Sequence, residues 1–191
     1  MTAVLVTPPA VEPVTLAEAK LNARVDGASE DQRILGLIRA ARGYVEEATG
    51  RVLIEQAWRI YRDDWPAAGV VRIRPAPLIR VDAVTVYDDA GVPSLVPAAD
   101  YLVDTASVPA RIRMDRALVA GGREINGIEI DVTAGYGPDA EDVPETLRQA
   151  VLMLVAHWFE NREAAQYRVA RAEIAHGVSR LVNPHRLVRI A

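Results

Sequence analysis

Two stretches of helical periodicity flank a long central stretch in which hydrophobic and polar residues alternate. From Ile34 to Ala48 the apolar residues recur at spacings of three and four, so they fall on one side of a helix expected over about 30–49. A wider apolar stripe from Leu147 onward predicts a second helix over about 144–163. Each helix has one apolar side, and we expect the two sides to pack on each other.

Capping signals predict where these and a further helix begin and end. Thr15 and Glu18 have the spacing of a capping box, so a short helix is expected over about 16–25. The three prolines that precede it favour an extended N-terminal arm. Gly50 is expected to end the helix over 30–49, because glycine readily adopts the left-handed conformation found at helix C-termini.

The two longer helices carry start signals as well. Ser29 and Gln32 repeat the capping-box spacing just before the first of them. Asp142 followed by Pro144 is typical of the start of the second, with a carboxylate cap and a proline in the first turn.

Between the helices, from about 52 to 134, the hydrophobic period falls to two. The segments here are short, rich in Val, Ile and Tyr, and separated by turn residues, which predicts antiparallel strands. Ile128, Ile130 and Val132 alternate with acidic residues, so one face of the last strand is expected to be buried. The segments expected to form strands are 52–62, 70–74, 78–87, 101–104, 110–114 and 125–134.

The sequence therefore predicts an α+β fold, in which a helical bundle carries an inserted antiparallel β region. The bundle comprises 14–50 and 143–165, the β insertion 51–137, and together they form one domain over 1–165. Residues 166–191 are expected to form an extended C-terminal tail, with too few apolar residues for a core and too many for a linker. We expect this tail to fold on a partner, and its deletion to leave thermal unfolding nearly unchanged.

Composition excludes several classes of protein. The 191 residues carry a net charge of −4 and are 50% hydrophobic, with a mean hydropathy of +0.05, as in a globular protein. Cysteine is absent, which excludes disulfides, a thiol nucleophile and thiolate metal sites. No apolar stretch reaches the roughly 20 residues of a membrane span, and the first ten residues lack a signal-peptide pattern. We expect no membrane partner and no cofactor.

Charge is unevenly distributed along the chain. Residues 161–191 contain six arginines against two glutamates, whereas the rest is acidic, which argues against a dedicated duplex-binding protein. An extended arm, a basic tail and an acidic body together favour a component of an assembly. On the helix over 30–49, the side opposite the apolar residues is interpreted as a solvated face or a contact between subunits. Its charged residues are Arg33, Arg39, Arg42, Glu46 and Glu47.

Catalytic motifs are scarce. The glycine patterns that cradle phosphates are absent, and Ser179 lacks the flanking pattern of a hydrolase nucleophile. His157 and Glu160 have the i, i+3 spacing that lets two helical side chains share a metal, but the chain has no second such pair. The favoured interpretation is a hydrogen-bonded His157 beside Trp158. A small metal- or ligand-binding enzyme that uses His157 and Glu160 is the alternative from another class.

Six segments spread over residues 13–163 carry a resemblance to a known family. They are PVTLAEAKLNARVD (13–26), ILGLIRAARGYVEEATGRVLIEQAW (34–58), DDWP (63–66), RPAPLIRVDAVTVYDDAG (74–91), DVTAGYG (131–137) and VPETLRQAVLMLVAHWFENRE (143–163). Each segment is weak alone. In this order they resemble the head-tail connector, or adaptor, family of tailed bacteriophages, which includes the adaptors of gene transfer agents.

The resemblance implies a non-enzymatic structural protein, assembled as a dodecameric ring beneath the portal at the capsid vertex. DNA would pass through the ring, whose other face would receive neck or tail proteins. It implies assembly in the host cytoplasm and then a place in the neck of the particle. A neck or tail-completion protein one layer further from the capsid is the alternative within the same class.

The resemblance also implies a role for the end of the chain. The stretch GVSRLVNPHR (177–186) resembles the terminal segment with which the family docks on the portal, although His176 stands where a proline is expected. The residues expected to dock are Val178, Leu181, Val182, Pro184, His185, Arg186 and Leu187.

Overall fold

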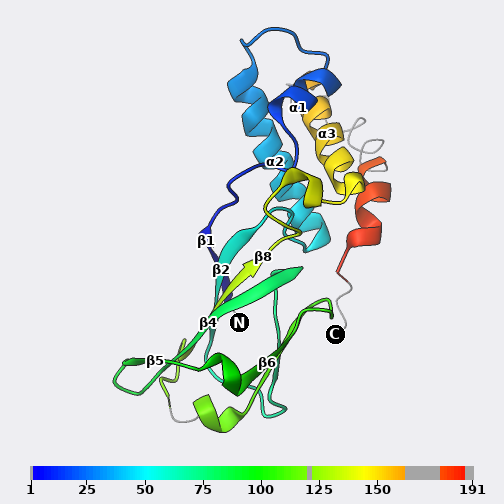
Figure 1. Cartoon of the computed structure of the whole chain (residues 1–191). Helices are drawn as coiled ribbons and strands as arrows, with labels where there is room; N and C mark the ends of the chain where they lie inside the picture. The colour runs from blue at the N-terminus through cyan, green and yellow to red at the C-terminus, as the bar shows by residue number, and fades with distance from the viewer. Residues whose placement is uncertain (1, 120–121, 162–176, 188–191) are drawn as a thin grey trace. The chain divides into compact units, whose positions relative to one another are not determined.

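The computed structural model describes residues 2–119, 122–161 and 177–187. Its helices and antiparallel sheets confirm the α+β class (Figure 1). The chain divides into two compact units, which are described separately. The β unit comprises Met1–Pro9 and Glu55–Tyr136, and the helical unit comprises Ala10–Ile54 and Gly137–Ala191.

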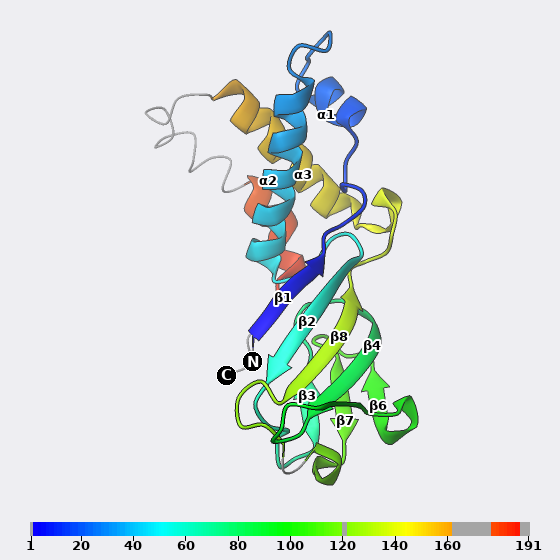
Figure 2. The same ribbon diagram turned by 90° about the vertical axis from the view of Figure 1, so that its left-hand side faces the viewer.

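The β unit contains two antiparallel sheets. The large sheet has the strand order β1-β2-β8-β4-β5 and the small sheet has the order β3-β7-β6. Figure 2 labels all of these strands except β5, which is labelled in Figure 1. The strands are β1 (Thr2–Thr7), β2 (Gln56–Arg62), β3 (Val70–Arg72), β4 (Leu78–Tyr87), β5 (Pro93–Leu95), β6 (Tyr101–Asp104), β7 (Arg111–Met114) and β8 (Ile128–Ala134). Two short 3-10 helices also belong to this unit, η1 (Ala98–Asp100) and η2 (Arg116–Val119).

One hydrophobic core is shared by the two sheets. Ile60 and Ile130 from the large sheet, Ile112 from the small sheet, and Trp65 from the loop between β2 and β3 are all fully buried in one cluster. The alternation predicted for the last strand is confirmed, because Ile128, Ile130 and Val132 are buried while Glu129 and Asp131 are partly exposed. Burial of one face therefore fixes the register of β8 between β2 and β4.

Two strands of the large sheet were not predicted. β1 lies within the stretch expected to be only an extended arm, and it pairs with β2 from Thr2 opposite Tyr61 to Thr7 opposite Ala57. All six residues of β1 are exposed, and its sequence TAVLVT does not alternate between apolar and polar residues, which is the pattern by which a half-buried strand is recognised. β5 has three exposed residues and begins with a proline, which confines it to the edge of the sheet.

The helical unit contains α1 (Leu16–Asn22), α2 (Asp31–Thr49) and α3 (Glu145–Glu160). α2 and α3 pack against each other, and α1 contacts both. The unit also contains the 3-10 helices η3 (Ala140–Asp142) and η5 (Asn183–His185), and residues 177–182 are helical. Most residues of the predicted apolar stripes are buried, namely Ile34, Ile38, Ala41, Val45, Leu147, Ala150, Val151, Leu154 and Val155. Ala48 and Trp158, which end the two stripes, are partly buried.

The first capping prediction and the C-terminal one are confirmed. The Thr15 hydroxyl accepts the Glu18 backbone N–H at 3.2 Å, and a carboxylate oxygen of Glu18 accepts the Thr15 N–H at 2.7 Å. Gly50 has φ +71° and donates its N–H to the Glu46 carbonyl, as expected of a left-handed C-cap.

The other two capping predictions are wrong. Glu30, not Ser29, is the N-cap of α2, and its side chain makes no capping hydrogen bond. Pro144 is the N-cap of α3. Asp142 instead bonds the backbone N–H of Asp139 at 3.0 Å and closes a capping box on η3. A spacing of three residues allows a capping box, but the local path of the chain decides which residue takes the cap position.

Candidate functional site

The end of the described chain, residues 177–187, packs within the helical unit. Val178 and Val182 are 4% and 2% exposed, so one side of this segment faces the interior. Gly177 lies so close to Met153 of α3 that a Cβ there would approach the Met153 Cε to 2.9 Å. Of the residues expected to dock on a portal, Pro184 and Arg186 are exposed. The others, Leu181, His185 and Leu187, are partly buried.

Hydrogen bonds attach this segment to the C-terminal end of α2. The backbone N–H of Leu187 donates to the carbonyl of Thr49 at 2.9 Å, and Arg186 Nε donates to the carbonyl of Ala48 at 2.9 Å. Arg51 Nε donates in return to the carbonyl of His185. The last carbonyls of a helix have no partner within the helix, so the segment 177–187 satisfies groups that α2 leaves open.

His185 ties the same segment to the start of α3. Its Nε2 lies 2.8 Å from the hydroxyl of Thr146. Burial lowers the pKa of His185, and the positive charge of Arg51 lowers this pKa further. Both effects favour the neutral imidazole, and protonating His185 would oppose the packed arrangement.

These contacts correct one expectation. Residues 177–187 pack on their own chain, so the tail prediction, in which the tail orders only on a partner, is wrong for this part of the chain. Deleting 166–191 would remove Val178 and Val182 from the interior of the helical unit, so an unchanged unfolding temperature is no longer expected. Residues 166–176 and 188–191, which also belong to the predicted tail, lie outside the described residues.

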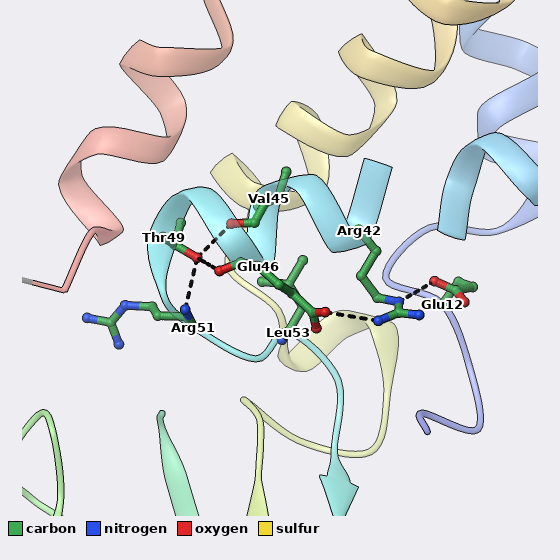
Figure 3. Close-up of polar contacts among 7 residues, drawn as sticks. All are labelled: Glu12, Arg42, Val45, Glu46, Thr49, Arg51 and Leu53. Atoms are coloured by element: carbon green, nitrogen blue, oxygen red, sulfur yellow. Dashed lines mark hydrogen bonds and ion pairs between the residues drawn. The ribbon is translucent and has the colours of Figure 1, made fainter. Parts of the chain in front are cut away.

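The predicted subunit-contact face of α2 divides into two sets. Arg42 Nε lies 2.7 Å from Glu12 and its NH1 lies 2.9 Å from Glu46, and both pairs are mostly shielded from solvent (Figure 3). Another carboxylate oxygen of Glu46 accepts the backbone N–H of Leu53 at 2.9 Å. Burial opposes the charge of Arg42, but bonds to the two glutamates and their negative charges outweigh it, and the pKa of Arg42 is raised. Arg42 and Glu46 are thus engaged by residues of their own chain, and Glu46 fixes the loop after α2.

The remaining charged residues of that face are more accessible. Arg39 and Glu47 are exposed. Arg33 is partly buried, with its guanidinium 5.1 Å from the centre of the Phe159 ring and 3.7 Å from the Glu30 carboxylate. Arg39 and Glu47 are consequently the members of the predicted set that are best placed to meet another molecule.

His157 and Glu160, the pair of the alternative metal-binding interpretation, lie in different surroundings. His157 is 8% exposed, and the Asn161 side-chain nitrogen lies 2.9 Å from both its Nδ1 and its backbone carbonyl. Glu160 is exposed at the end of α3. The interpretation of His157 as a hydrogen-bonded residue is confirmed. Within 2–119, 122–161 and 177–187, no group of three or more His, Asp or Glu side chains is placed to hold a metal ion.

Two of the hollows on the described part of the β unit lie beside its sheets. The larger, about 420 Å³, lies beside the small sheet, and its walls include Tyr101, Leu102 and Arg113. The smaller, about 250 Å³, lies at one end of the large sheet and is lined partly by Asp63, Asp64 and Glu124.

No helix in the described part of the chain is long and apolar enough to cross a membrane.

Sequence reasoning missed a set of arginines on the small sheet. Arg72 and Arg74, and then Arg111 and Arg113, occupy alternate positions between apolar residues and are all exposed. The alternation itself is the signal that could have found them, because alternate residues of a strand share one face.

Residues 102–186 match the sequence model of the family described as "Phage gp6-like head-tail connector protein". This match extends from β6 through α3 to the segment packed on α2. This part of the chain is therefore similar to a head-tail connector domain. The resemblance to the connector family is thereby confirmed, and the matched segment includes every residue predicted to dock except Leu187, which lies one residue beyond it.

Solved structures extend the likeness to the whole length of the chain. One similar chain comes from a structure titled "Virion of native gene transfer agent (GTA) particle", with a TM-score of 0.84. Another is from "Neck of empty GTA particle computed with C6 symmetry" (TM-score 0.82), and a third is from "Neck of native GTA particle computed with C12 symmetry" (TM-score 0.75). Each is 28% identical, and each alignment covers 100% of this chain and 98% of the other. No curated protein matches the chain.

Proposed function

We propose that this protein is a structural head-tail connector that forms a ring in the neck of a virus-like particle. The ring lies beneath the portal, joins the DNA-filled capsid to the neck and tail, and lets DNA pass through it. The observation that carries the proposal is the full-length likeness, at 28% identity, to chains from the neck and virion of gene transfer agents. The connector match over 102–186 supports it independently.

A ring of identical copies fits this likeness. Two of the similar chains come from necks with C6 and C12 symmetry, and a dodecamer of this chain is compatible with both. Cyclic rings need two different surfaces on each subunit, one meeting the other on the next copy. Assembly in the host cytoplasm followed by incorporation into the neck is the sequence of events that this function requires.

The portal contact falls on the exposed side of residues 177–187. Val178 and Val182 face the interior of the helical unit and support the segment, whereas Pro184 and Arg186 are accessible to a partner. Leu181, His185 and Leu187 lie between these two sides. The segment therefore presents a prepared surface, because its backbone is already held by α2 and α3.

Particle incorporation tests the proposed function. Particles purified from a producing strain should contain this chain at the neck by electron microscopy, and it should crosslink to the portal through Pro184→Cys in a chain that otherwise has no cysteine. Leu21→Cys, on the exposed side of α1, is the matched control and should give no portal crosslink. Crosslinks to a tail protein alone would favour the neck-completion alternative, and absence from particles would refute both.

A catalytic role has weaker support. The enzyme alternative relies on His157 and Glu160, and the buried ring of His157 already bonds Asn161. We propose that the protein acts without catalysis, through contacts alone. Metal analysis of the purified chain, together with His157→Ala, tests this: stoichiometric metal that the variant loses would support the enzyme.

A further inference from the structure

The exposed face of the small sheet is rich in arginine. Arg111 and Arg113 project from β7, and Arg72 and Arg74 project from β3 and the residues after it, while the intervening Val71, Ile73 and Ile112 are buried. We call these four arginines the arginine face. Two carboxylates lie at its margin, Asp104 on β6 and Asp115 after β7.

Most of this positive charge is not neutralised within the described chain. Asp104 binds Arg111 at 2.5 Å, and its pKa is lowered by the Ser107 hydroxyl and by Arg111. Among the residues that the structure describes, Arg72, Arg74 and Arg113 have no carboxylate within ion-pair distance. Arg72 also stands directly opposite Arg111, and like charges in that position destabilise a sheet. A face that retains such a pair is suited to an external negative partner.

An exposed leucine on the same face indicates a protein partner rather than nucleic acid. Leu102 on β6 is paired with Arg113, so the two side chains share the outer face, and Leu102 is 72% exposed. The hollow of about 420 Å³ adjoins both residues. Protein interfaces combine arginine with apolar residues in this way, whereas a surface that binds only the phosphates of a nucleic acid does not require an exposed leucine.

The same β unit carries a surface of opposite charge at one end of its large sheet. Two contacts bring three loops together there, since the backbone of Asp88 pairs with that of Gly122 and the Asp63 carboxylate accepts the backbone N–H of Asn126 at 2.9 Å. Arg123 in this region is engaged by the carbonyls of two neighbouring residues and the Tyr87 ring. The exposed acidic residues are Asp63, Asp64, Asp88, Asp89 and Glu124, which we call the acidic end.

The acidic end has apolar residues beside it, as the arginine face does. Val92 is 58% exposed and Ile125 is 70% exposed, and both belong to the loops that carry the acidic residues. Three of those acidic residues line the hollow of about 250 Å³, so this end is concave. The β unit therefore has one basic and one acidic surface, each with exposed apolar side chains.

We propose that the arginine face of one copy docks on the acidic end of the next copy, with Leu102 against Val92 and Ile125. The inference rests on the proposed ring and names its contact, because two different surfaces of one chain that fit each other form a heterologous interface. Charge selects the partner surface and the register, and apolar burial stabilises the contact.

Crosslinking in assembled particles tests the proposal, and the absence of cysteine makes the chain suited to it. Particles carrying the double variant Arg113→Cys, Glu124→Cys, treated with a flexible bis-maleimide, should give a ladder of covalent multimers on a denaturing gel. The control pair Arg80→Cys, Glu124→Cys should give none, since Arg80 is exposed on the large sheet rather than on the arginine face. A ladder from the control but not from the test pair would overturn the proposal.

Charge exchange gives a second readout. Arg113→Glu should reduce ring formation at least about tenfold, and adding Glu124→Arg should restore it. Rings that form equally well with Arg113→Glu would overturn the contact while leaving the connector function intact, because wild-type incorporation tests that function separately. Loss of binding to double-stranded DNA in Arg113→Glu, with the crosslinked ladder absent, would assign the arginine face to nucleic acid instead.

Discussion

The packing of residues 177–187 on their own chain can be tested by truncating one buried side chain. Val182 is 2% exposed and follows the helical turn that also buries Val178. If this segment belongs to the core of the free protein, Val182→Ala will destabilise the isolated chain. If it orders only on a portal, the same substitution will leave the isolated chain unchanged.

The expected magnitude follows from the volume removed. Val182→Ala deletes the equivalent of two methylene groups, each contributing about 0.8 kcal/mol on burial, and leaves a small cavity. The free energy of unfolding of the helical unit should fall by about 2 kcal/mol. For a chain of this size that corresponds to a decrease in Tm of about 4–8 °C.

Circular dichroism at 222 nm follows the helices and measures this change directly, in guanidinium and on heating. Leu21→Ala is the matched control, because Leu21 is 82% exposed on α1 and its truncation should change stability by less than about 0.5 kcal/mol. A Val182→Ala chain that unfolds like wild type, with the control also unchanged, would refute the packing described for 177–187.

Three further outcomes are expected. Arg42→Met should lower the free energy of unfolding by about 1–3 kcal/mol in denaturant titrations, because it leaves the shielded Glu46 carboxylate without its ion pair. An unchanged free energy of unfolding would show that the pair contributes nothing. Gly50→Ala should destabilise the protein by about 1–2 kcal/mol, because residue 50 has a φ of +71°. Gly43→Ala should instead stabilise it by about 0.5–1 kcal/mol, because residue 43 lies in mid-helix and an added Cβ would meet open space. Equal effects of the two substitutions would contradict this reasoning. The pKa of His185 is lowered in the folded chain, so the unfolded chain binds the proton at a higher pH and stability should fall as the pH drops below about 6.5. His185→Gln should remove this part of the pH dependence. A variant with the same pH profile of stability as wild type would argue against this role of His185.

The helices and most strands were predictable because their signals are local. The apolar stripe of α2 follows from 3.6-residue periodicity, and the caps at Thr15 and Gly50 involve residues no more than four apart. β1 gave no such signal, because its six exposed residues are held by pairing with β2, about fifty residues later in the chain. The capping box expected at Ser29 failed for a related reason, since a local spacing permits a bond that the path of the chain then does not make.

The candidate site was predicted in part. The resemblance drew attention to 177–187, but the order of residues could not divide it into Val178 and Val182, which face inward, and Pro184 and Arg186, which face outward. Likewise, Arg42 and Arg39 look equivalent on a helical projection. Only the position of Glu12, thirty residues away, shows that Arg42 forms an ion pair within its own chain.

By itself, the sequence determined the α+β class, the places of the main helices and strands, and the resemblance to the connector family. Periodicity and capping depend on neighbours within a few residues, and the linear order of segments carried the family likeness. The tertiary structure alone decided which charged residues are shielded, how the end of the chain caps α2, and how strands from distant segments place four arginines on one face. Those features depend on contacts between residues far apart in the chain, and a single sequence does not specify which of the many possible pairings burial will select.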